Sequence, residues 1–225
     1  MAIVVQSSSK AGWLSSSPCD ITAPSGIQSS NLLVLFAFGK QGDPTEIIDD
    51  ADWTYVDGIT TGGESMAILK RVATVADQSV STYSIDTAVT DITGLIMLRL
   101  TGAQNVFTNR SEQSVDTGVF TSLDLTPSVA NSMILWGVFA YPSGDGPISG
   151  HQIATDNPTW TEAQAISYSV PMAIGSASVV YALRAETTAT GDFSINDPGN
   201  GQLAMAVMLI PELISPSASM SPSAS

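Results

Sequence analysis

The sequence predicts an all-β protein, a jelly-roll-like antiparallel β-sandwich of about twelve strands built from an internal duplication. Three observations lead to this prediction. Short runs rich in Val, Ile, Thr, Tyr, Phe and Leu alternate with clusters of Gly, Pro, Asp, Asn and Ser. No long stretch repeats apolar residues at helical spacing. The same series of short segments also occurs twice along the chain.

The apolar and β-branched runs place the strands, and the Gly, Pro, Asn and Asp residues between them predict turns. In the first half the expected strands lie near 20–23, 31–39, 52–57, 65–74, 81–86 and 94–101. In the second half they lie near 123–126, 132–141, 159–163, 177–186, 191–196 and 202–210.

Short segments that match in the same order indicate the duplication. Matched pairs are 20–25 with 124–128, 31–38 with 131–139, 42–44 with 144–147, 52–54 with 158–161, 67–74 with 180–187, 83–86 with 193–196 and 94–98 with 201–205. Two small sandwiches or one interlocked sandwich could result. We expect one domain over residues 1–212, with repeat halves near 20–104 and 123–212, because either half alone would bury a small core.

Four expected central strands are apolar on both faces. A strand with one face in water would alternate between apolar and polar residues, and these strands do not. Either loops and the opposite sheet cover both faces within the chain, or one face packs against another subunit. The strands concerned are 32–38, 95–98, 133–139 and 203–210.

Composition excludes several classes of function. Seven Lys and Arg residues face 21 Asp and Glu residues, a formal net charge of −14. This excess argues against nucleic acid as a partner and against binding to anionic lipid. No apolar stretch approaches the length of a membrane-spanning helix, so we expect no membrane insertion. The N-terminus lacks the cationic region of a signal peptide, which predicts synthesis in a cytoplasm without export.

The sequence contains one Cys (Cys19) and one His (His151), which excludes a zinc site made from protein Cys and His ligands. We therefore assign no catalytic residue, no cofactor and no metal. His151 lies in a Gly-flanked segment and is expected to be an exposed loop residue. A calcium site is the alternative to a solvated loop for one acidic stretch. That stretch contains Glu46, Asp49, Asp50, Asp52 and Asp57.

Two matched positions carry side chains that bear on function. Trp53 and Trp160 are each followed by Thr, and a duplicated position favours a duplicated packing role. If the protein instead binds carbohydrate, Trp53, Trp160 and Tyr141 are the expected glycan contacts. Arg71 and Arg184 also match, and we expect each to form an ion pair or to bond backbone carbonyls.

The segment 213–225 differs in kind from the rest. It ends in two copies of Ser-Pro-Ser-Ala-Ser separated by Met220, which predicts an extended tail without a core of its own. Such a segment becomes ordered when another surface provides partners, for example by strand addition to a neighbouring subunit. Leu213, Ile214, Pro216 and Pro222 are the expected assembly contacts.

The segments 31–38, 52–56 and 66–73 resemble β-sandwich proteins of tailed bacteriophages, in which an apolar strand precedes a Gly-Trp-Thr-like strand and a strand ending in Lys/Arg-Val-Ala. Here Asp52 stands where the Gly is usual. Ser-Pro-Ser-Ala-Ser repeats also resemble tails of viral structural proteins. The resemblance implies a non-enzymatic virion component: a capsid decoration protein, or a tail or fibre subunit. Its expected partners are copies of itself, with a trimer as the first guess, other virion proteins and, in the alternative, a host surface glycan.

Overall fold

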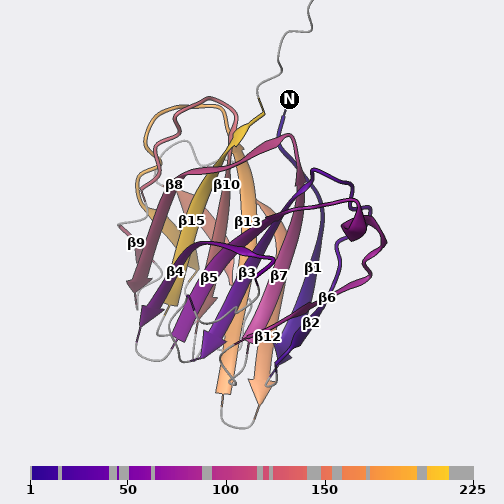
Figure 1. The fold of residues 1–225 in the computed structure, drawn as a ribbon. Helices are drawn as coiled ribbons and strands as arrows, with labels where there is room; N and C mark the ends of the chain where they lie inside the picture. Colours follow the sequence, from indigo (N-terminus) through magenta and orange to yellow (C-terminus); the bar gives the residue numbers. More distant parts are fainter. Residues whose placement is uncertain are drawn as a thin grey trace, which may run out of the picture.

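The computed structural model describes residues 2–14, 17–40, 45, 51–61, 64–87, 93–115, 119–121, 124–140, 148–153, 159–170, 173–196 and 202–212. These residues form a nearly all-β structure of antiparallel sheets (Figure 1), which confirms the expected all-β sandwich. Within the described ranges, no helix has the length and apolar composition to cross a membrane.

The first large sheet has five strands in the order β1-β7-β3-β5-β4. A two-stranded sheet, β2-β6, accompanies it, and a short 3-10 helix, η2 (Ala76–Ser79), precedes β6. The strands are β1 (Val4–Leu14), β2 (Cys19–Thr22), β3 (Leu32–Lys40), β4 (Thr54–Thr61), β5 (Glu64–Val72), β6 (Thr82–Ile85) and β7 (Thr93–Thr101).

The second large sheet also has five strands, in the order β12-β13-β10-β15-β8. A three-stranded sheet, β11-β14-β9, accompanies it. The strands are β8 (Ala103–Val115), β9 (Val119–Phe120), β10 (Ser132–Ala140), β11 (Ser149–Ile153), β12 (Thr161–Val170), β13 (Ala173–Arg184), β14 (Phe193–Asn196) and β15 (Gln202–Pro211).

The two large sheets have the same strand order when the matched segments are superposed. The matches equate β3 with β10, β5 with β13, β7 with β15 and β4 with β12, which leaves β1 in the place of β8. An internal duplication would produce this order, and it stays our interpretation of it. The expected halves leave out β1 and β8, which complete the two sheets. All strands of each large sheet come from one part of the chain, so the strand order does not confirm a jelly roll.

Four layers explain why the central strands are apolar on both faces. The large sheets pack face to face through one buried cluster, which takes Val34, Phe36 and Phe38 from β3. The opposite face of β3 presents Leu33 and Leu35 to a second cluster beneath β2-β6. The same alternation continues on β7, which contributes to the same two clusters. On β10 and β15 one face joins the first cluster, and the other joins a third cluster between the second large sheet and β11-β14-β9. The chain itself therefore buries both faces, as the first of the two alternatives expects.

Several strand predictions need correction. No strand is found at residues 124–126, within the expected 123–126 strand, and the nearby pairing strand is β9 at Val119–Phe120. The sequence prediction also missed β1, β8 and β11. The strands β1 and β8 form sheet edges, and their Ser-, Gln- and Asn-rich stretches lack the apolar runs that marked the central strands.

Every outer strand of the two large sheets contains a register shift. Shifts occur in the pairs β1–β7, β4–β5, β12–β13 and β15–β8, whereas the pairs made by β3 and β10 run without one. In β4 and β12 the shift falls two residues after the Trp-Thr pair, at Val56 and Ala163. Bulges of this kind twist an edge and discourage strand pairing with another molecule.

Candidate functional site

The matched tryptophans pack against the outer faces of the two large sheets. Trp53 is 6% exposed and meets Tyr83 of β6 edge-on, with ring centroids 6.1 Å apart. Trp160 is half-buried, with its ring 5.5 Å from Trp136 and 6.4 Å from Phe193 of β14. The buried ring of Trp53 cannot stack on a sugar. The other expected contacts, Tyr141, Leu213, Ile214, Pro216 and Pro222, lie outside the described residues.

Arg71 links an exposed carboxylate to a buried one. Its guanidinium contacts Asp52 at 2.8 Å and Asp77 at 2.9 Å. Asp77, which is 1% exposed, also accepts hydrogen bonds from Thr74 N, Thr74 Oγ1 and Tyr83 Oη. Burial opposes ionisation of Asp77, but these bonds and the charge of Arg71 outweigh it and lower the pKa of the carboxyl.

Arg184 is 1% exposed and bonds the loop that follows β13. Its guanidinium donates to Thr188 O at 3.0 Å and to Ala189 O at 3.2 Å. The expectation of an ion pair or a carbonyl contact thus holds for both arginines, through the ion pairs of Arg71 and the carbonyl contacts of Arg184. In both cases the cation stabilises the loop that follows its strand.

The other cations with described side chains also bond within the chain. Lys10 Nζ donates to Ala165 O at 2.7 Å, Lys70 Nζ donates to Asn105 O at 3.0 Å, and Arg99 donates to Gly26 O and to Ser7 Oγ. Lys10 and Lys70 each bridge the two large sheets, at opposite lateral edges. These cations therefore have structural partners within the chain, and the formal net charge of −14 already includes them.

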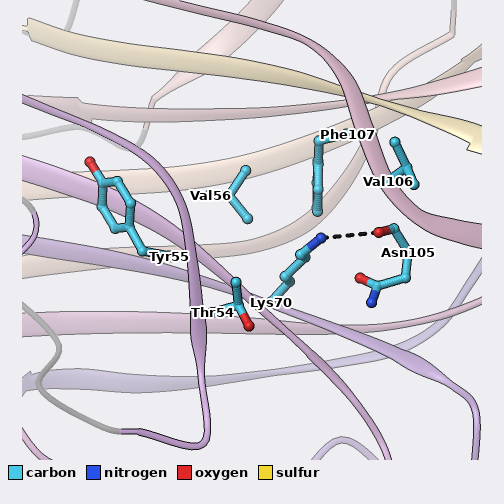
Figure 2. A pocket seen from close by; sticks show the side chains of 7 residues that line it. All are labelled: Thr54, Tyr55, Val56, Lys70, Asn105, Val106 and Phe107. Atoms are coloured by element: carbon cyan, nitrogen blue, oxygen red, sulfur yellow. Dashed lines mark hydrogen bonds between the residues drawn. The ribbon is translucent and has the colours of Figure 1, made fainter.

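One groove lies at the lateral edge where β4 and β5 meet β8. We call it the Lys70 groove. Its volume is about 250 Å³, and Figure 2 shows the seven side chains that line it. They are Thr54, Tyr55, Val56, Lys70, Asn105, Val106 and Phe107.

Inside the Lys70 groove, the lysine is directed toward β8 (Figure 2). Its Nζ lies 3.0 Å from Asn105 O and 5.6 Å from the centroid of the Phe107 ring. An ammonium carries three N–H donors, and the ring face adds a cation–π attraction. Tyr55 points away from the lysine, so it does not form a platform over it. The geometry suits a bridge that closes the sandwich edge.

A second, larger groove lies at the opposite lateral edge, where β1 meets β12 and β13. We call it the Val4–Leu183 groove. Its volume is about 540 Å³. Matching 67–74 with 180–187 equates Lys70 with Leu183, so matched positions contribute to both grooves. Its lining is Ile3, Val4, Val5, Met133, Thr159, Thr161, Tyr181, Ala182 and Leu183.

Exposed apolar side chains concentrate at these two grooves. Val4 and Leu183 are 43% and 46% exposed, and Tyr55 and Val106 are 39% and 48% exposed. Across the described residues, the other large apolar side chains with comparable exposure are Val72, Val75 and Val129. Sequence reasoning did not find the grooves, because their linings come from strands far apart in the chain.

The expected chemistry of the acidic stretch is only partly visible. Asp52 pairs with Arg71, and Asp57 Oδ1 accepts a bond from Gly58 N. Glu46, Asp49 and Asp50 lie outside the described residues. In the part of the chain that is described, no three His, Cys, Asp or Glu side chains are placed to hold a metal ion.

His151 differs from the exposed loop residue that we expected. It lies on β11, with its ring 4.7 Å from Trp136 and its Nε2 3.2 Å from Ser178 Oγ. Burial against the second large sheet lowers the pKa of His151 to about 4. The imidazole is therefore neutral near pH 7 and helps to attach β11 to the sheet beneath it. Cys19 is also buried, and burial raises the pKa of its thiol.

Comparison of the chain with protein-family models, with curated proteins and with solved structures finds no match.

Proposed function

We propose that this protein is a non-enzymatic virion structural protein that acts by self-association and by docking on a phage capsid or tail. The observation that carries the proposal is a pair of grooves with exposed apolar rims at opposite lateral edges of the sandwich. Their rims hold Val4, Leu183, Tyr55 and Val106, four of the seven exposed large apolar side chains of the described residues. Grooves rimmed by exposed apolar side chains are typical of interaction sites.

The chemistry of the grooves supports binding more than catalysis. Neither lining contains a carboxylate, an imidazole or a thiol. These are the groups that most often act as general acid, general base or nucleophile. The lysine of the smaller groove already donates to a backbone carbonyl.

The edges of the sheets support a building block that assembles through side chains. Each outer strand of the large sheets is bulged, and Lys10 and Lys70 tie the sheets together at their lateral edges. Backbone pairing at these edges is disfavoured, so contacts between copies would use the grooves and the segment after Glu212.

Two measurements test this proposal. Light scattering on the purified full chain over a range of concentrations should show a defined oligomer. Phage particles purified from the source of the chain should carry the protein on the capsid or tail, as detected by immunogold electron microscopy. A strictly monomeric chain that is absent from such particles would overturn the proposal.

Carbohydrate binding is the second candidate function, and the exposed ring of Tyr55 favours it. Aromatic rings on a protein surface suit stacking on sugars, and Tyr55 lies at the rim of a groove that also contains Thr54 and Asn105. A glycan array probed with the full chain and with Tyr55→Ala tests it. Binding that Tyr55→Ala removes would support it, and an array without signal would exclude it for the glycans displayed.

A further inference from the structure

We propose that the Val4–Leu183 groove receives the Leu213–Ile214 segment of a neighbouring copy of the chain. This inference rests on the proposed self-association and names the surface that accepts the tail. The occupant is apolar and short, and it comes directly after the last strand. The chemistry of the groove and the position at which that strand ends carry the argument.

The groove has the size and chemistry for a pair of aliphatic side chains. Its volume of about 540 Å³ lies in the range of sites that enclose a small ligand. Ile3 and Met133 at its base are buried, whereas Val4 and Leu183 at its rim are 43% and 46% exposed. Covering these rim side chains would remove apolar surface from water.

The tail offers few side chains that could fill such a groove. From residue 213 to the end, the sequence consists of Ser, Pro and Ala apart from Leu213, Ile214 and Met220. Leu213 and Ile214 are adjacent, so an extended backbone directs them to opposite sides and a turn or twist directs them to one. Ser and Pro in the rest of the segment favour an extended spacer.

The last described residues bring the tail to the same end of the sandwich as the groove. Pro211 pairs with Ala103, and Glu212 N donates to Gly102 O at 2.8 Å. Gly102 approaches the residues before β1 so closely that a Cβ there would clash with Ala2 O. Met133 of the groove lies between Leu209 of β15 and Leu183 in neighbouring ladders.

The direction of the chain favours a neighbour's groove over its own. Up to Glu212 the backbone continues the ladder between β15 and β8, on the side of the sheet away from β12. A turn precedes β10, and in it Ser132 Oγ donates to Val129 O. Because β10 pairs with both β13 and β15, this turn lies between the ends of these two strands. Leu213 and Ile214 come one and two residues after Glu212, within roughly 7 Å of it when extended, so the neighbouring copy has to present its groove at this end of the sandwich.

Disulfide trapping between two copies tests the inference. Leu183→Cys in one preparation and Ile214→Cys in another are mixed and oxidised with copper phenanthroline. The native thiol, Cys19, is buried and does not compete. We expect a covalent dimer that contains one copy of each variant. The matched control uses Val75→Cys in place of Leu183→Cys. Val75 is 73% exposed and directly precedes η2, so this variant should form far less cross-linked dimer.

A second variant measures the same contact without a cross-link. Leu183→Asp places a charge at an exposed rim position, so the fold should be kept, and the oligomer seen by light scattering should dissociate at a concentration at least tenfold higher than that of the unchanged chain. Val75→Asp is its control and should leave the oligomer intact.

Three outcomes overturn the inference. One is a double variant, Leu183→Cys with Ile214→Cys, whose disulfide forms only within a single chain at every protein concentration. Another is trapping at Val75→Cys that equals trapping at Leu183→Cys. The third is an oligomer that Leu183→Asp leaves unchanged, in which case self-association stands and only the assignment of the groove fails. A chain that is monomeric throughout would remove the proposed function as well.

Discussion

The ring of Phe36 occupies the space that a side chain at position 137 would need. Phe36 lies on β3 and Gly137 on β10, the central strands of the two large sheets. A Cβ added to Gly137 would lie 2.6 Å from Cδ1 and 2.7 Å from Cε1 of Phe36. Real Cβ atoms do not approach so closely, so this glycine permits the close contact of the two sheets at their centre.

Gly137→Ala should therefore lower the stability of the fold. Phe36 is fully buried, and neither its ring nor the β10 backbone can move without disturbing the shared core. Overpacking of this kind typically costs about 1–3 kcal/mol of the free energy of unfolding. Denaturation in guanidinium chloride, with the m-value checked for change, measures it.

Two controls separate this clash from a general effect of alanine in a strand. Gly12→Ala on β1 introduces a Cβ with nothing within 4 Å and should change the free energy of unfolding by at most about 0.5 kcal/mol. Phe36→Leu combined with Gly137→Ala should be less destabilising than the sum of the single variants, since the smaller side chain leaves room. Equal effects of Gly137→Ala and Gly12→Ala would contradict the role given to Phe36.

The central strands could be predicted because their residues are apolar at consecutive positions, which indicates that both faces are buried. Runs such as 32–38 and 133–139 contain no charged residue, and a segment of that length with β-branched and aromatic residues favours a buried strand over a helix. The matched segments fall on strands at equivalent positions in the two large sheets, and an internal duplication stays our interpretation of that order.

The edges and the grooves could not be predicted from the same signals. Ser7, Ser8 and Ser9 of β1 give no apolar run, yet Ser8 Oγ bonds Ala163 O of the opposite sheet. The groove linings depend on how β1 meets β12 and how β4 meets β8, which no local pattern encodes. His151 was expected to be exposed because of its Gly neighbours, but a long-range contact with Trp136 determines its burial.

Asp77→Asn should destabilise the protein much more than Asp52→Asn, although both carboxylates bind Arg71. Asp77 is 1% exposed and accepts bonds from Thr74 and Tyr83, so replacing it leaves donors without a charged acceptor. We expect a loss of about 2–4 kcal/mol for Asp77→Asn. The carboxylate of Asp52 is 70% exposed, and its replacement should cost about 1 kcal/mol or less.

The same pair of variants has a pH signature. Because the pKa of Asp77 is lowered in the folded protein, its contribution to stability is present above the pKa of the unfolded chain and is lost as pH falls through the folded pKa. The difference in unfolding free energy between the unchanged chain and Asp77→Asn should therefore shrink below about pH 4. A difference that stays constant between pH 7 and pH 3 would contradict this assignment.

His151 should weaken the fold as the pH falls. Its pKa is about 4 in the folded protein, against 6.5 for an ordinary histidine, so the unfolded chain binds a proton that the folded chain excludes between these values. The free energy of unfolding should fall by up to about 3 kcal/mol from pH 6.5 to pH 4 on account of this group. Proton NMR of the imidazole, the only one in the chain, gives the midpoint directly.

His151→Gln provides the comparison for that measurement, because it keeps a polar side chain near Ser178 and removes the titration. Other carboxyl groups titrate in both proteins, so the difference between the two pH profiles isolates the histidine. Parallel profiles, or an imidazole midpoint near 6.5, would show that the ring is accessible to water on β11.

Lys70→Met should be nearly neutral for stability, whereas Lys70→Ala should not. The lysine places its Nζ against Asn105 O and the Phe107 ring, so its aliphatic stem covers part of the edge between β5 and β8. Methionine keeps most of that stem and loses the ammonium. We expect Lys70→Ala to cost about 1 kcal/mol more than Lys70→Met in chemical denaturation. Equal losses for the two variants would mean that the ammonium bonded to Asn105, which both remove, closes this edge, and that packing of the stem does not.

Deletion of residues 213–225 should separate assembly from folding. Ordering a backbone costs about 1–2 kcal/mol per residue, and a segment made largely of Ser, Pro and Ala cannot offset this by burying its own side chains. The truncated chain should therefore unfold with a free energy within about 0.5 kcal/mol of the full chain. In light scattering it should self-associate less than the full chain, because Leu213 and Ile214 are removed with the tail. If the truncated protein assembles and docks as well as the full chain, the tail is a passive linker and its assignment to assembly is wrong.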